Sequence, residues 1–251
     1  MTRDWSRILR AAFQPQHYLS FVTSHIYPDW NQFFVRRYIM GSGAFPFECR
    51  IRTPMGVVSV TLYSPEDCYT VQEIFGLQCY RADKQQIYVD FGANIGISAA
   101  YFLSRNPAAY VYCYEPLPEN VAKLRRNLAP FAGRYNVQEV AIADRDGEIS
   151  FRVERTGRYS GIDNQQGELR QFPCVNASRV LHEIVQARGG IDFLKIDVEG
   201  AEALFVPLLD EHTLSKTGVI CIEGKEVLSS SAFRLSKTIS GVLRYTQNIP
   251  R

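Results

Sequence analysis

Three acidic residues each stand at or just after the end of a short apolar run in this sequence. Asp90 lies at the end of one run, Glu115 follows a second, and Asp197 follows a third. Parallel strands end at a common edge of their sheet, and ligands bind at that edge where the strand order reverses. The sequence therefore predicts that these three carboxylates gather around one ligand.

The first acid opens a glycine-containing stretch, Asp90-Phe91-Gly92-Ala93-Asn94-Ile95-Gly96. Glycines allow a ligand to approach the backbone, and the helix that follows offers free N–H groups. The spacing differs from the G-x-G-x-x-G dinucleotide pattern, and a carboxylate suits a cationic group better than a pyrophosphate. S-adenosylmethionine carries an ammonium and a sulfonium and no phosphate, so it fits. Taken alone, the stretch is explained equally well as a tight turn between strand and helix.

The other two acids extend this interpretation. Glu115, followed by Pro116, is placed to accept hydrogen bonds from ribose hydroxyls, although an acid near a helix N-terminus is the plainer alternative. Asp197 and Glu199 are two positions apart and would share one face if the strand continued. Crowded carboxylates are costly unless a cation or a ligand is near. Simple decoration of a helix N-terminus explains Glu199 and Glu202 better than it explains Asp197.

The composition is that of an ordinary globular protein. The 251 residues are 46% hydrophobic and 22% charged, with a net charge of +2, too small to indicate nucleic acid or an anionic membrane as a partner. No apolar run approaches the ~20 residues that cross a bilayer, and the first residues do not resemble a secretory signal. None of the six cysteines forms a C-x-x-C pair. We expect reduced, buried cysteines and a cytoplasmic location.

Short apolar strands alternate with helical segments from residue 87 onward, which predicts an α/β fold with a mostly parallel sheet covered on both faces. Residues 1–86 are predicted to form an N-terminal extension with a helical region in 1–40 and a hairpin over 47–63, and 87–251 the main domain. Segment 155–172 is predicted to be a loop. Only 242–249 looks strand-like after residue 223, which leaves open whether the far edge of the sheet is complete. The predicted strands are 87–91, 110–114, 137–142, 149–153, 193–197 and 218–222; the predicted helices are 95–105, 118–129, 178–188 and one within 201–216.

Four stretches together resemble the FkbM-type S-adenosylmethionine-dependent methyltransferases: DFGANIG, the YEP at Tyr114–Pro116, DRDGE at 144–148 and FLKIDVEGAE at 193–202. The resemblance covers about residues 47–223. It implies a Rossmann-like class I methyltransferase fold and methyl transfer to a hydroxyl of a sugar, glycan, polyketide or related secondary metabolite. It further implies that the cofactor is bound by Asp90, Gly92, Ala93, Asn94, Gly96, Glu115, Pro116, Ala141, Ile142, Asp144 and Asp197.

Methylation of an alcohol requires a base to take the hydroxyl proton. The favoured catalytic residues are Asp197, Glu199 and Glu223, whereas His182 and His212 are expected on the surface. A magnesium ion held by acids at neighbouring strand ends is the less favoured alternative, and no metal ligands are assigned. The competing functions are a nicotinamide-dependent oxidoreductase and a nucleoside-binding module without catalysis.

Overall fold

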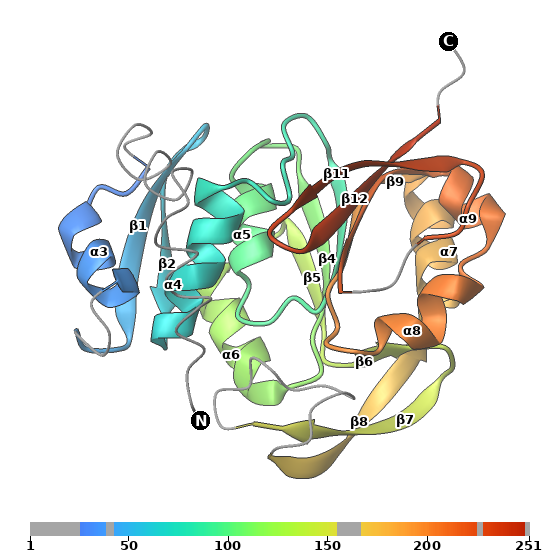
Figure 1. Ribbon diagram of the computed structural model, residues 1–251, viewed down its shortest axis with the longest axis horizontal. Coiled ribbons are helices and arrows are strands. Elements are labelled where there is room, and N and C mark those ends of the chain that lie inside the picture. The colour runs from blue at the N-terminus through green and yellow to red at the C-terminus, as the bar shows by residue number, and fades with distance from the viewer. Residues whose placement is uncertain (1–25, 39–42, 155–166, 225–227, 249–251) are drawn as a thin grey trace. The chain divides into compact units, whose positions relative to one another are not determined.

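The computed structural model describes residues 26–38, 43–154, 167–224 and 228–248 (Figure 1). The chain forms two compact units, Met1–Arg81 and Ala82–Arg251. The sequence places the division a few residues later, at 86/87, directly before the first strand of the main sheet. No helix among the described residues is both long enough and apolar enough to cross a membrane.

The first unit contains the predicted hairpin. Thr53 pairs with Gly56 across a turn formed by Pro54 and Met55, and Gly56 adopts the positive φ of 112° that glycine tolerates. The helical region expected in 1–40 is represented by one helix, while 1–25 lie outside the described residues. The elements are α3 (Trp30–Tyr38), β1 (Phe47–Thr53), β2 (Gly56–Leu62), α4 (Pro65–Val71) and the π-helical turn η1 (Gln72–Gly76).

The second unit is built on a seven-stranded sheet of order β11-β12-β10-β9-β3-β4-β5. The five strands from β10 to β5 are parallel, and β12 is antiparallel to both of its neighbours. This mostly parallel sheet confirms the predicted Rossmann-like class I methyltransferase fold. The strands are β3 (Ile87–Phe91), β4 (Tyr110–Tyr114), β5 (Tyr135–Gln138), β9 (Ile191–Ile196), β10 (Thr217–Glu223), β11 (Phe233–Ile239) and β12 (Val242–Gln247).

Helices cover both faces of this sheet (Figure 1). On one face, Val89 and Leu194 pack with Leu181 and Phe205 from the helices that follow β8 and β9. On the other face, Tyr88 stacks on Phe102 at 4.5 Å between ring centroids. These packing contacts fix the strands that carry the predicted site. The helical segments are α5 (Ile97–Leu103), α6 (Pro118–Asn127), η2 (Ala129–Phe131), α7 (Ala177–Arg188), α8 (Glu202–Phe205), η3 (Val206–Leu208) and α9 (Glu211–Ser215).

A separate three-stranded sheet of order β6-β8-β7 differs from the sequence-based expectation. Its strands are β6 (Ala141–Ala143), β7 (Gly147–Val153) and β8 (Glu168–Asn176). The predicted strand 137–142 is therefore divided: its first residues belong to β5 in the main sheet and its last residues to β6 in the smaller sheet. The predicted loop 155–172 is wrong for residues 168–172, which pair with β7; residues 155–166 lie outside the described part of the chain.

The later part of the chain answers one open question and corrects one expectation. The far edge of the sheet is complete, because β11 and β12 form an antiparallel pair and β12 pairs with β10. The helix expected within 201–216 is split into α8, η3 and α9. Pro207 lies in the 3₁₀ turn η3, where a proline ends the preceding α-helix because it lacks an N–H.

Candidate functional site

The strand register brings the predicted acids to one edge of the main sheet. Tyr114, Phe91, Ile196 and Ile222 are Cα partners across β4, β3, β9 and β10. The residues that follow them therefore form a second row at the carboxyl edge. That row consists of Glu115, Gly92, Asp197 and Glu223.

The order of the strands also reverses at this place. From β3 the chain proceeds to β4 and β5 on one side, and later to β9 and β10 on the other. The switch point, where open α/β sheets bind their ligands, thus lies between β3 and β9. The row of four residues straddles this switch point.

Gly92 makes room for the protein's own backbone. It has a φ of +79°, and a Cβ at this position would overlap the carbonyl oxygen of Asp197. Gly96 has a φ of +85°, and a Cβ there would lie 3.1 Å from Cγ of Leu124. The fold itself therefore requires both glycines, a reason that differs from the ligand approach expected from the sequence.

Asp90 is completely buried on the face of the sheet that α5 covers. Its Oδ2 accepts a hydrogen bond from the hydroxyl of Ser98 at 2.5 Å, and its Oδ1 lies 3.0 Å from Nζ of Lys195. Both carboxylate oxygens are thus engaged within the protein.

Lys195 occupies the centre of the switch point and is 2% exposed. Its Nζ lies 3.2 Å from Oδ2 of Asp197, donates to the carbonyl of Gly92 at 2.9 Å and approaches the carbonyl of Phe91 at 3.4 Å. Burial alone would lower the pKa of Lys195, but the carboxylates of Asp197 and Asp90 outweigh burial and raise it. The lysine is therefore a permanent cation in this structure.

Glu115 is 3% exposed and lies at the end of β4. Its carboxylate accepts hydrogen bonds from the backbone N–H groups of Asn94 at 2.9 Å and Leu117 at 3.1 Å, and from the Asn120 side chain at 3.2 Å. Burial, opposed by these hydrogen bonds, raises the pKa of Glu115 to about 7. This carboxylate ties the turn after β3 to the segment after β4.

The loop after β9 separates the acids that the sequence places together. The strand ends at Ile196, and Glu199 has a positive φ of 53°, so the strand alternation expected for Asp197 and Glu199 does not apply. The Asp197 side chain is 26% exposed, whereas Glu199 is exposed. The buried Glu202 carboxylate accepts the N–H groups of Val198 and Gly200 at 2.8 and 2.7 Å, which fixes the loop.

The residues expected to border the adenine lie on β6 and just after it. Ala141 and Ile142 are buried, and Asp144 is partly exposed. Ala141 belongs to an apolar cluster that also contains Leu117, so β6 packs against the segment that follows Glu115. The carbonyl of Asp144 accepts a hydrogen bond from the Asn176 side chain at 2.5 Å. Pro116 is partly exposed, and Ala93 is buried.

The two candidate histidines belong to the helical layer. His182 on α7 and His212 on α9 are exposed, and their ring centroids lie 6.0 Å apart. Neither belongs to the row at the sheet edge. Within the described residues no group of three or more His, Cys, Asp or Glu side chains is arranged to hold a metal ion, and the six cysteines are buried and form no disulfide bond.

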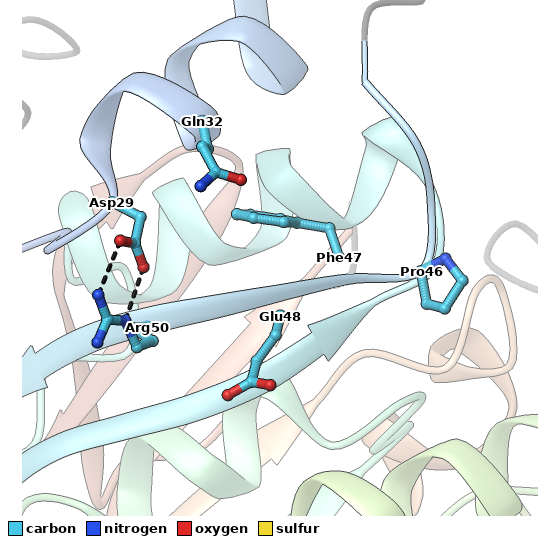
Figure 2. A pocket seen from close by; sticks show the side chains of 6 residues that line it. All are labelled: Asp29, Gln32, Pro46, Phe47, Glu48 and Arg50. Atoms are coloured by element: carbon cyan, nitrogen blue, oxygen red, sulfur yellow. Dashed lines mark hydrogen bonds and ion pairs between the residues drawn. The ribbon is translucent and has the colours of Figure 1, made fainter.

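A pocket of about 430 Å³ lies in the first unit (Figure 2). Its polar wall includes Asp29 and Arg50, joined by two hydrogen bonds of 2.7 and 2.8 Å. None of its residues was predicted to be functional. The lining residues are Asp29, Gln32, Pro46, Phe47, Glu48 and Arg50.

The fold and the row of acids define a Rossmann-like protein of the class I methyltransferase type. Residues 90–233 match the model of the methyltransferase FkbM domain, a match that spans more than half of the chain. The chain belongs to the FkbM methyltransferase family.

Three relatives show how far the similarity extends. The chain is 31% identical over 153 residues to the 2-O-methyltransferase NoeI of Sinorhizobium fredii, covering 55% of this chain and 62% of NoeI. It is 26% identical over 188 residues to the 31-O-demethyl-FK506 methyltransferase FkbM of Streptomyces tacrolimicus, covering 61% of this chain and 72% of that protein. It is 24% identical over 218 residues to the AMB antimetabolite synthetase AmbE of Pseudomonas aeruginosa, covering 70% of this chain and 10% of AmbE. The matched region is therefore less than two thirds of NoeI and a small part of AmbE.

Sequence reasoning missed Lys195, Ser98 and Asn120, which hold the carboxylates of the site. The signal for Lys195 was present in the sequence: a lysine inside the apolar run Phe193–Ile196 is rarely buried without an acidic partner. Ser98 and Asn120 leave no such signal, because hydroxyl and amide side chains are common on helices.

Proposed function

We propose that this protein is an S-adenosylmethionine-dependent methyltransferase that methylates a hydroxyl group. The observation that carries the proposal is the row of Glu115, Gly92, Asp197 and Glu223 at the switch point, in a chain of the FkbM methyltransferase family. The resemblance of the sequence implies an acceptor among sugars, glycans and polyketide-type metabolites. The relatives NoeI and FkbM are named as O-methyltransferases, which supports this class of reaction.

The residues around the switch point suit the proposed cofactor. Glu115 offers carboxylate oxygens to ribose hydroxyls, which are hydrogen-bond donors. Asp197, the more exposed partner of Lys195, offers negative charge to the ammonium group. The backbone from Gly92 to Gly96 borders the methionine part, and β6 with Asp144 borders the adenine.

Methyl transfer requires alignment and removal of one proton. Bound S-adenosylmethionine supplies an activated methyl group on its sulfonium. The protein's own contribution is to hold the acceptor oxygen in line, which supplies much of the rate, and to accept the hydroxyl proton. Asp197, Glu199 and Glu223 are the proposed acceptors of that proton. Glu223 suits this role best, because it is half-buried, ends β10 and lies next to Asp197 in the row.

Calorimetry on the purified chain tests the cofactor. We expect S-adenosylhomocysteine to bind and the nicotinamide dinucleotide NAD not to bind. Tight NAD binding without S-adenosylhomocysteine binding would instead support the oxidoreductase.

Isotope transfer then tests catalysis. S-adenosylmethionine with a labelled methyl group is incubated with a panel of hydroxylated glycans and polyketides, and labelled products are identified by mass spectrometry. We expect Glu223→Gln to lower kcat while leaving the affinity for S-adenosylhomocysteine unchanged. Cofactor binding with no transfer to any acceptor would support the non-catalytic module.

A further inference from the structure

We propose that Lys195 is a positioning residue that holds Asp197 toward the ammonium group of the cofactor, and that Asp90 acts on the cofactor only through Lys195. The inference rests on the proposed methyltransferase function. It assigns a role to a residue for which the family resemblance gave none, and it changes the role expected for Asp90.

Oxygen atoms of the protein occupy the hydrogen-bond donors of the Lys195 ammonium group. An ammonium group has three hydrogens. Four oxygens surround Nζ of Lys195: the Gly92 carbonyl at 2.9 Å, Asp90 Oδ1 at 3.0 Å, Asp197 Oδ2 at 3.2 Å and the Phe91 carbonyl at 3.4 Å. With these oxygens around a buried ammonium, the lysine serves the protein and does not contact a ligand.

Asp90 is placed to serve the lysine. The two residues are Cα partners on the parallel strands β3 and β9, and the Asp90 side chain is 0% exposed. A buried lysine is costly unless it is paired. Asp90 therefore supplies the buried counter-charge and has no exposed surface with which to contact an ammonium.

Asp197 is the exposed member of this group of three charged side chains. Its side chain is 26% accessible, against 3% for Lys195 and 0% for Asp90. The Asp197 carboxylate is therefore the one that can face a ligand. The lysine also joins the two loops that form the site, because it binds the Gly92 carbonyl and the Asp197 carboxylate together.

Two ligands distinguish a loss of Asp197 positioning from a general loss of folded structure. S-adenosylhomocysteine carries the amino-acid group, whereas 5′-methylthioadenosine retains the nucleoside and lacks that group. Calorimetry on the full chain gives the ratio of their dissociation constants for each variant. Loss of Asp197 positioning should change this ratio, and a general loss of structure should weaken both ligands.

The decisive variants are Asp90→Asn and the double variant Asp90→Asn/Lys195→Met, which removes the buried pair together. We expect Asp90→Asn to retain S-adenosylhomocysteine binding within about threefold, because Lys195 still holds Asp197. We expect the double variant to bind S-adenosylhomocysteine about tenfold more weakly, as for the loss of a charged hydrogen bond, with 5′-methylthioadenosine unchanged. The control is Asp192→Asn, at the opposite end of β9, where the carboxylate accepts the N–H groups of Gln86 and Ile87; it should leave the ratio unchanged.

Two results would overturn the inference. The first is a loss of about tenfold in S-adenosylhomocysteine affinity in Asp90→Asn alone with 5′-methylthioadenosine retained, since this would mean that Asp90 contributes to binding the amino-acid group even while Lys195 still holds Asp197. The second is wild-type affinity in the double variant. If the double variant does not fold, Asp90→Asn alone still decides the first point. A wild-type chain that binds neither ligand would instead refute the proposed function.

Discussion

Glu115 is the residue whose chemistry at the site depends most directly on pH. It is buried, and its pKa is raised from 4.5 to about 7. A hydroxyl group donates more strongly to a carboxylate than to a carboxylic acid. Ligand binding should therefore favour the ionised form of Glu115. At a pH where Glu115 is protonated in the free protein, binding should release that proton.

The expected result is an affinity for S-adenosylhomocysteine that rises between pH 6 and 8 by about tenfold, with a plateau above the pKa of Glu115. Calorimetry in buffers of different ionisation enthalpy measures the proton released. Glu115→Gln should bind more weakly and lose this pH dependence. A pH-independent affinity in the wild type would contradict the role of Glu115.

Glu202 shows how one carboxylate fixes a loop. It accepts the backbone N–H groups of Val198 and Gly200 and is 5% exposed. Glu202→Gln replaces one acceptor oxygen by an NH₂ group and leaves one N–H without a partner, so the free energy of unfolding should fall by about 1–3 kcal/mol. Glu139→Gln, at an exposed position between β5 and β6, is the control and should change it by no more than about 0.5 kcal/mol. Denaturant unfolding of the two variants measures the difference, and equal effects would show that Glu202 does not hold the loop.

At the scale of the elements, the turn after β3 and the loop after β9 are packed against each other. Gly92→Ala should destabilise the fold both by the positive φ and by the overlap with the Asp197 carbonyl. Gly133 is a matched control, because its φ is +82° and nothing lies within 4 Å of an added Cβ. We expect Gly133→Ala to cost about 1–2 kcal/mol and Gly92→Ala to cost more, measured by thermal or denaturant unfolding. Equal costs would mean that the close approach to Asp197 has no energetic weight.

The sequence predicts elements well where burial gives a continuous apolar run. The strands β3, β4, β9 and β10 are central and covered on both faces, so their runs stand out. The edge strand β11 is exposed along most of its length, and its residues give no apolar run. The segment from Val137 to Ile142 reads as one strand although the chain passes there from one sheet to another.

The site, like the fold, could be predicted only in part from the sequence. The acids at the strand ends could be found from local motifs, because each motif lies within a few residues. The pairing of Asp90 with Lys195 depends on the register of two strands that are distant in the sequence, and no local pattern specifies that register. The sequence therefore identifies the carboxylates but not their partners.

At the scale of the whole molecule, every residue proposed to bind the cofactor belongs to the unit Ala82–Arg251. Hydrogen exchange with saturating S-adenosylhomocysteine should therefore slow amides at the carboxyl ends of β3, β4 and β9 and leave β1 and β2 unchanged. Binding at about 100 times the dissociation constant should stabilise that unit by about 2.7 kcal/mol. NAD at the same concentration is the control. Slowed exchange in β1 or β2 would show that the first unit also takes part in cofactor binding.

The order of the last strands affects synthesis as well as structure. β12 follows β11 in the chain, but in the sheet it lies between β11 and β10, so that β11 is the edge strand. While the polypeptide leaves the ribosome, β10 therefore remains an open, apolar edge until Val242–Gln247 has emerged. Unpaired edges of this kind can recruit foreign strands, so nascent chains that stall before residue 242 should depend on chaperones to stay soluble.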